Sequence, residues 1–507
     1  MTGLTKTLLI VFLCLFSTTL LQAQADTSGA KPSEGGQTPA AKAQDSLRIQ
    51  PDTTAKPAML PAPAATPTPA PAPKLNTLTI SVDMRVRTEF RHGYRNLPLK
   101  DTAAGSPAFF VNQRTRLNFD YKMKNFDFYA SVQDARVWGE QDPREGQGTT
   151  SSTTANPSTT FPLYLFEGYV EPHFNDRWSI RIGRQRVIYD NQRLYAENDW
   201  RLPGNSHDAV RLIYNNKINL NSELLFSFGQ SAENNFTTNY VPLTNTLSTP
   251  TRNYKNLLVH YLNYKISKTL ILTTINTMDG YQSSVPANYQ TTYQRFTFGG
   301  RLEYQTYNWY ATFSGYYQTG KDSSSKKIDA YYIQPEVKYS TKTLAIRLGF
   351  ELMSGQDSTI ESDKTHNFVP LYGVAHRFMG NMDFFTTFPA DLNNGGLFNP
   401  YLFFQYTKNK WNVRLENHLF YSQKNAAFKG LPEKSKYLGY ENDWRVNFKP
   451  TPIIDIEYGF CWALATKSLA EVRNPKSSGA LLDRYTKTPY WSYLSIRVTP
   501  TIGKFTF

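Results

Sequence analysis

The sequence predicts an all-β fold: a transmembrane antiparallel β-barrel of about eighteen strands, preceded by a disordered N-terminal spacer. Three observations support this prediction. Apolar and charged residues alternate in steps of two, long and short connections follow one another in turn, and aromatic residues are abundant. The 507 residues include 33 Tyr, 32 Phe and 8 Trp, although only 40% of the chain is hydrophobic. A polar average with many aromatic residues is typical of a wall with one apolar and one polar face.

The N-terminus has the pattern of an export signal. Residues 1–23 contain one positive charge at Lys6, an apolar stretch and small residues near Ala23, which predicts a signal peptide. Residues 24–75 are rich in Pro and Ala, and such a segment forms an extended spacer because it has no apolar period to bury. This periplasmic spacer would reach a periplasmic partner or peptidoglycan, or remain solvated without a partner. Residues 76–507 are then the barrel domain.

The strands of the barrel are predicted from period-two alternation. In residues 79–91 one set is apolar and the intervening set is charged or polar. Residues 111–122 repeat this division, as do 295–304, 344–352, 411–421, 438–448 and 453–464. Successive side chains of a strand point to opposite faces, so each of these strands has one apolar and one polar face. Residues 126–137 and 163–171 keep the period less well, which predicts β-bulges there.

The connections distinguish a barrel from a soluble sandwich. Short turns are predicted at 122–125, 172–177, 215–218, 265–268, 305–308, 340–343, 407–410 and 449–452. Long connections are predicted between them at 92–108, 138–162, 187–206, 230–253, 278–292, 318–327, 353–396, 423–437 and 465–489. Eight short and nine long connections predict eighteen strands, with the short turns in the periplasm and the long loops outside.

The polar phase of each strand must face the lumen, because a closed barrel in lipid needs an apolar outer wall. A barrel of this size is wide enough to hold water. Guanidinium groups match carboxylates bidentately, and rows of them attract anions. The predicted pore-lining arginines are Arg85, Arg87, Arg114, Arg116, Arg136 and Arg181, with Arg193 on a loop that can fold into the bore. The acids expected to orient them are Glu89, Asp120 and Glu167. The alternative is that these arginines form structural ion pairs that brace the wall.

Five strings carry a family resemblance: VRTEFRHGY (86–94), QRTRLNFDYK (113–122), QDARVWGEQ (133–141), RIGRQRVIYDNQRL (181–194) and HDAVRLIY (207–214). Together they resemble the alginate-export family of outer-membrane barrels. The resemblance spans about 78–507 and implies an eighteen-stranded porin-like barrel in the bacterial outer membrane. It also implies an arginine-lined, partly loop-gated pore that passes an anionic polysaccharide. Relatives of such a barrel that carry other acidic solutes leave the substrate open.

Two other readings remain. The 353–396 segment contains enough apolar residues to plug the bore, which would make the protein a binding or adhesion barrel. An outer-membrane hydrolase is the second alternative, but adjacent strand residues face opposite sides, so His207-Asp208 is not a ready catalytic pair. We expect no enzyme activity, no cofactor, no metal and no nucleic-acid partner. The expected partners are outer-membrane lipid and an acidic solute.

Overall fold

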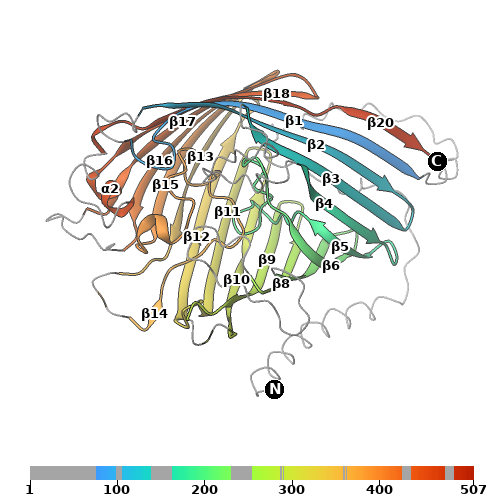
Figure 1. The fold of residues 1–507 in the computed structure, drawn as a ribbon, viewed down its shortest axis with the longest axis horizontal. Helices are drawn as coiled ribbons and strands as arrows, with labels where there is room; N and C mark the ends of the chain where they lie inside the picture. The colour runs from blue at the N-terminus through green and yellow to red at the C-terminus, as the bar shows by residue number, and fades with distance from the viewer. Residues whose placement is uncertain are drawn as a thin grey trace, which may run out of the picture. The chain divides into compact units, whose positions relative to one another are not determined.

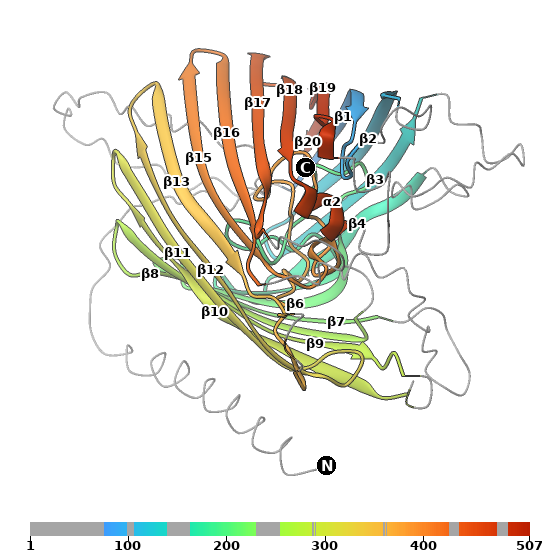
Figure 2. The ribbon, with the colours of Figure 1, turned by 90° about the vertical axis from the view of Figure 1, so that its left-hand side faces the viewer.

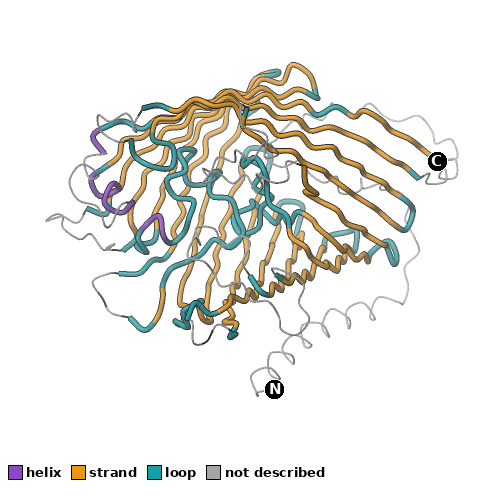
Figure 3. Tube along the Cα trace, viewed as in Figure 1, coloured by secondary structure: helices purple, strands orange, loops and turns teal. Residues whose placement is uncertain are grey.

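The computed structural model describes residues 76–98, 106–138, 163–229, 254–285, 288, 290–357, 360, 362–424, 435–473 and 485–507. The predicted signal peptide and spacer lie outside these residues. The described chain is almost entirely strands and loops (Figure 3). Helical residues are confined to short segments, among them the α-helix α2 (Lys467–Arg473) and the 3-10 helix η5 (Ala390–Leu392).

The strands follow one another around a single sheet (Figure 1). The first ten are β1 (Thr77–His92), β2 (Ala108–Lys122), β3 (Phe126–Val137), β4 (Leu163–Pro172), β5 (Trp178–Gln185), β6 (His207–Asn215), β7 (Leu220–Phe228), β8 (Asn256–Lys265), β9 (Leu270–Gln282) and β10 (Thr292–Gln305). The others are β11 (Trp309–Lys321), β12 (Lys327–Ser340), β13 (Leu344–Met353), β14 (Lys364–Thr365), β15 (Leu397–Lys408), β16 (Trp411–Ser422), β17 (Tyr437–Thr451), β18 (Ile454–Ala465), β19 (Tyr490–Val498) and β20 (Thr501–Thr506).

The sheet closes on itself, and its wall has eighteen strands as predicted. The last two strands pair antiparallel with the two halves of β1: β19 with Met84–His92 and β20 with Thr77–Ser81. They are one wall strand interrupted at Pro500, which has no N–H to donate to the ladder. The two-residue strand β14 is an addition that pairs parallel with β12. Without β14, and with β19 and β20 as one, the twenty strands make eighteen.

All eight short turns lie where the sequence places them. The long connections also fall at the predicted places, with one exception in length. The prediction of a long loop at 318–327 is wrong, because β11 continues to Lys321 and β12 begins at Lys327. Thr319 pairs with Asp329 in this hairpin. The polar residues that suggested a loop are therefore the ends of β11 and β12, which continue beyond the apolar part of the wall. The predicted bulge is present between β3 and β4, where the register shifts at Ser131 and Val132.

Burial alternates along the strands in the predicted phase. In β1, Asp83, Arg85 and Arg87 are buried while the intervening Met84 is 36% exposed. Exposed apolar side chains on other strands include Leu117, Phe298, Leu302, Phe313, Val337, Ile346, Leu348, Leu402, Phe404, Leu494 and Ile496. The outer wall is therefore apolar and the charged phase faces inward. No helix among the described residues is long and apolar enough to cross a membrane.

Residues 186–206 and 366–396, from two of the long connections, lie inside the ring of strands (Figure 2). We call them the first and the second inner loop. Most of their described residues are buried, including Leu194 and Tyr195 in the first and Phe384 and Phe385 in the second. They pair with each other, because the N–H of Tyr372 donates to the carbonyl of Leu194 at 2.9 Å. The inner loops and the charged inner wall form the interior of the barrel.

Candidate functional site: arginines and loops in the lumen

Arginines of β1 hold the backbone of the first inner loop. The guanidinium of Arg85 donates to the carbonyls of Asp199 (2.7 Å), Trp200 (3.2 Å) and Arg201 (3.1 Å). Arg87 also donates to the Trp200 carbonyl, at 3.0 Å. Alternation along β1 aims both guanidinium groups at the lumen, and three consecutive loop carbonyls accept hydrogen bonds from them.

Arginines of β2 hold a side chain of the same loop segment. The Asp199 carboxylate accepts from Arg114 at 2.5 Å and from Arg116 at 2.7 Å, and Arg497 lies 3.8 Å away. Arg114 also donates to Asp83 at 3.0 Å. Burial alone would raise the pKa of the Asp199 carboxyl, but Arg114 and Arg116 hold that pKa well below its usual range. The inner wall thus binds a carboxylate, supplied here by the protein itself. We call Arg85, Arg114 and Arg116 with Arg497 the arginine cluster.

Trp200 joins the first inner loop to the second and to the wall. Its ring stacks on His376 of the second inner loop with centroids 4.2 Å apart. The Arg87 guanidinium lies 4.3 Å from the Trp200 ring centroid, in a cation–π contact. Trp491 and Tyr493 of β19 meet the ring edge-on. One indole therefore packs against three separate parts of the chain.

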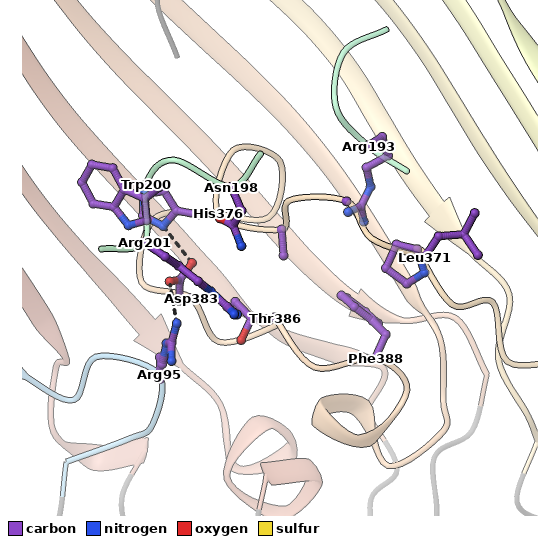
Figure 4. A pocket seen from close by; sticks show the side chains of 13 residues that line it. Arg95, Arg193, Asn198, Trp200, Arg201, Leu371, His376, Asp383, Thr386 and Phe388 are labelled. Atoms are coloured by element: carbon purple, nitrogen blue, oxygen red, sulfur yellow. Dashed lines mark hydrogen bonds and ion pairs between the residues drawn. The ribbon is translucent and has the colours of Figure 1, made fainter. Parts of the chain in front are cut away.

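A small cavity of about 40 Å³ lies between the inner loops. Figure 4 shows the residues that line it, among them Arg95, Arg193, Asn198, Trp200, Arg201, Leu371, His376, Asp383, Thr386 and Phe388. Asp383 is the acid here: it lies 2.8 Å from His376 Nδ1 and 3.7 Å from Arg95, and it accepts from the Tyr94 hydroxyl. Burial alone would raise the pKa of Asp383, but His376 and Arg95 lower it to about 2. The cavity therefore combines an ionised carboxylate with arginines.

Arg193 lies inside the bore, as its place on a long loop predicts. Its side chain is buried and lies 2.9 Å from the Glu351 carboxylate of β13. It also donates to the carbonyl of Val374 at 3.2 Å, and its guanidinium contacts the sulfurs of Met353 and Met379. Arg193 therefore ties the first inner loop both to the wall and to the second inner loop.

Two of the predicted orienting acids contact arginines in the lumen. Glu89 accepts from Arg87 at 2.8 Å and from Arg91 at 2.8 Å. Glu167 accepts from the side chain of Arg186 at 2.7 Å, where the first inner loop leaves β5. Glu89 therefore pairs with two arginines of β1 outside the arginine cluster, whereas Glu167 fixes the start of the loop.

Arg181 and Asp120 lie apart from the cluster. Arg181 pairs with Glu171 of β4 at 2.6 Å. Asp120 lies 3.8 Å from Lys122, near the end of β2 that leads into a short turn. These contacts are local pairs along the wall, as the alternative of structural bracing anticipates.

Arg136 does not reach the lumen. In β3 the buried phase is Ser131, Gln133 and Ala135, so Arg136 shares the opposite phase with Asp134. Arg136 is exposed and forms a bidentate pair with Asp134, with both N–O distances 2.8 Å. Its predicted place on the inner wall is corrected by this phase, which the weak alternation of β3 did not reveal.

Apart from Arg497 of β19, the residues that sequence reasoning missed are on the loops. Asp199 and Trp200 fall within residues 179–201, which contain five arginines, but periodicity says nothing about loop side chains. Glu197 is another, paired with Arg186 at 2.6 Å. Composition was the one available signal. Asp199 and Trp200 follow several arginines in a loop that contains many apolar residues, and such a loop is expected to pack inside the barrel.

Comparison with known proteins agrees with this architecture. The family model for alginate export matches residues 77–463, more than half of the chain. No curated protein matches the sequence. The structure is similar to OccAB4 of Acinetobacter baumannii, with 13% identity, a TM-score of 0.54 and coverage of 85% of this chain and 99% of that chain. It is also similar to the outer membrane protein OpdK of Pseudomonas aeruginosa, with 11% identity, a TM-score of 0.54 and coverage of 84% and 99%. At these identities the likeness shows the fold alone, whereas the family match covers most of the barrel. The chain therefore belongs to the alginate export family and is a channel protein of the bacterial outer membrane.

Proposed function

We propose that this channel passes anionic polysaccharide or acidic sugars, and that the arginine cluster binds their carboxylates during passage. The observation that carries the proposal is Asp199, a carboxylate already held by Arg114 and Arg116 on the inner wall. A uronate carboxylate has the same charge and the same two acceptor oxygens, so it fits the same donors.

Passage requires the first inner loop to move, since the arginines of the cluster are buried beneath it. Arg114 is 0% exposed and Arg85 is 6% exposed. Loop displacement would expose a row of guanidinium groups along β1 and β2. Each would hold a carboxylate weakly in the wet lumen, and a polyanion could then pass from one group to the next. Selectivity from rows of charged side chains is known in other channels.

A second candidate, a plugged binding or adhesion barrel, is favoured by one observation. Both inner loops are packed inside the bore, with buried aromatic residues such as Tyr195 and Phe385. If this packing is permanent, the protein binds solutes at its mouth and conducts no ions. Electrical recording separates the two candidates, because only the channel carries current.

The selectivity experiment compares two double variants in planar bilayers. Replacing Arg114 and Arg116 together by Ala removes two charges from the lumen, and we expect the reversal potential in a salt gradient to shift toward cations. The matched control replaces Arg177 and Arg184, which are exposed or half-exposed and lie outside the cluster. Block by uronate oligomers should weaken in the first variant and at high salt. An unchanged reversal potential in the first variant would count against the arginine cluster.

A further inference from the structure

A second group of ionisable side chains lies on the inner face of β16 and β17, apart from the arginine cluster. In the register of these strands Glu416 pairs with Asp443, and His418 pairs with Glu441. Residues two apart share a face, so all four side chains point the same way. All four are buried, and Glu441 and Asp443 are 0% exposed. We call them the β16–β17 acid group.

The charges of this group do not balance. Arg445 binds both oxygens of Glu416 at 2.6 Å, which neutralises one of the three carboxylates. The next guanidinium, Arg414, is 3.9 Å from Glu416 but also pairs with Glu457 at 3.5 Å. If Glu441 and Asp443 are both ionised, two negative charges stay without a counter-ion in a buried place. An uncompensated buried charge costs several kcal/mol, so these two carboxyls either share a proton or bind a cation.

Two carboxylate oxygens of this group are left without a hydrogen bond. Asp443 Oδ1 and Glu441 Oε2 are buried and have no hydrogen-bond partner among the described residues. Their other oxygens accept the backbone N–H groups of Asn381 (3.0 Å) and Met382 (2.7 Å) in the second inner loop. Gly380 makes this approach feasible, because a Cβ there would collide with the Glu441 carboxylate.

His418 has a ring nitrogen available for a cation. The side-chain amide of Asn399 lies beside His418 Nδ1, with its oxygen 3.1 Å and its nitrogen 3.3 Å away, and the nitrogen also lies 3.3 Å from the Leu419 carbonyl oxygen. In the tautomer that carries its proton on Nδ1, His418 donates to the Asn399 oxygen and keeps the lone pair on Nε2. A hydrogen bond of this kind commonly orients a metal-binding histidine. Ligand atoms of Glu416, His418 and Asp443 lie within 4.8 Å of one another.

We propose that the β16–β17 acid group binds one divalent transition-metal cation, for which Zn²⁺ is the natural probe. Histidine nitrogen with carboxylate oxygen is a common ligand set for zinc. Ca²⁺ fits less well, because it takes six to eight oxygen ligands and no nitrogen. A divalent cation also cancels the two unbalanced charges. Since Glu441 and Asp443 hold the backbone at Asn381 and Met382, the cation would anchor the second inner loop to the wall.

Zinc binding to the full-length protein in detergent tests this proposal. Wild-type protein is stripped with a chelator, titrated with ZnCl₂, and assayed for bound zinc per chain and for Tm. We expect about one tight zinc per chain and a Tm that rises with zinc. Asp443→Asn and His418→Gln should each weaken zinc binding at least ~10-fold. His260→Gln, on β8, is the matched histidine control and should bind zinc as the wild type does.

The stability of the metal-free proteins keeps the test decisive if a variant is hard to fold. Asp443→Asn removes a buried carboxylate that has no ion-pair partner. The metal-free variant should therefore be at least as stable as the metal-free wild type, and adding zinc should not change the Tm of the variant. Zinc binding by Asp443→Asn and His418→Gln at wild-type affinity would overturn the proposal. So would a wild-type protein that retains no zinc and whose Tm is unchanged by it, in which case Glu441 and Asp443 share a proton instead. The site does not depend on what the channel carries.

Discussion

Replacing Asp199 with asparagine should release the first inner loop from the wall. The carboxylate accepts from Arg114 at 2.5 Å and from Arg116 at 2.7 Å, both in a buried setting. Removing one partner of a buried ion pair costs about 3–5 kcal/mol, because the other charge stays buried and unpaired. Asparagine keeps one acceptor oxygen, so we take the lower end, ~3 kcal/mol. At about 1.4 kcal/mol per factor of ten, the ratio of docked to released loop falls roughly 100-fold.

Single-channel recording measures this change directly. Asp199→Asn should open more often, or to a larger conductance, than the wild type, and its anion preference should rise because one lumenal negative charge is lost. Asp208→Asn is the matched control, since that carboxylate is 64% exposed and pairs with the half-exposed Arg184. An exposed pair contributes little, so this control should behave as the wild type does. Identical traces for Asp199→Asn and the wild type would refute the view that this ion pair holds the loop.

Three further predictions follow from the loops and the wall. Burial and the charge of Asp199 raise the pKa of Glu197 from 4.5 to about 7, and Arg186 opposes this rise. Between pH 4.5 and pH 7, Glu197 therefore holds a proton when the loop is docked and loses it when the loop is released. Docking is then strongest at low pH and weakens as the pH rises through 7; the open fraction should be larger at pH 8 than at pH 5.5, and Glu197→Gln should remove that difference. Trp200→Ala should destabilise the packed inner loops by ~3–5 kcal/mol, so a protease should cleave these loops faster than in the wild type. Cleavage at the wild-type rate would contradict the role of the indole. Leu348 lies on the outer face of β13 and is 61% exposed, so Leu348→Arg should lower the free energy of unfolding by ~2–4 kcal/mol, measured by urea unfolding in lipid vesicles. Leu348→Met is the control. No loss of stability in Leu348→Arg would argue that this face does not contact lipid.

The wall of the barrel could be predicted from the sequence because its rule is local. Each strand must turn its apolar residues to lipid, so the outward phase of Met84 determines the inward direction of Arg85, the next residue along the chain. The same rule places Arg114 and Arg116 in the lumen. It fails at Arg136, where β3 does not alternate cleanly and the end of the strand leaves the membrane, so that a charge on the outer phase is tolerated.

The contacts of the lumen could not be predicted in the same way. Asp199 meets Arg114 across 85 residues of chain, and no period links the two positions. The strands determine where guanidinium groups point, but the loops determine what they touch. The β16–β17 acid group shows the same limit, because strand phase turns Asp443 inward while only the register with β16 brings it to Glu416.

The most direct test of the central claim is the current carried by the purified full-length protein in a planar bilayer. A closed wall with arginines inside predicts discrete conductance steps, together with a reversal potential in a KCl gradient that has the sign of chloride preference. Absence of any conductance, or a clear preference for potassium, would contradict it.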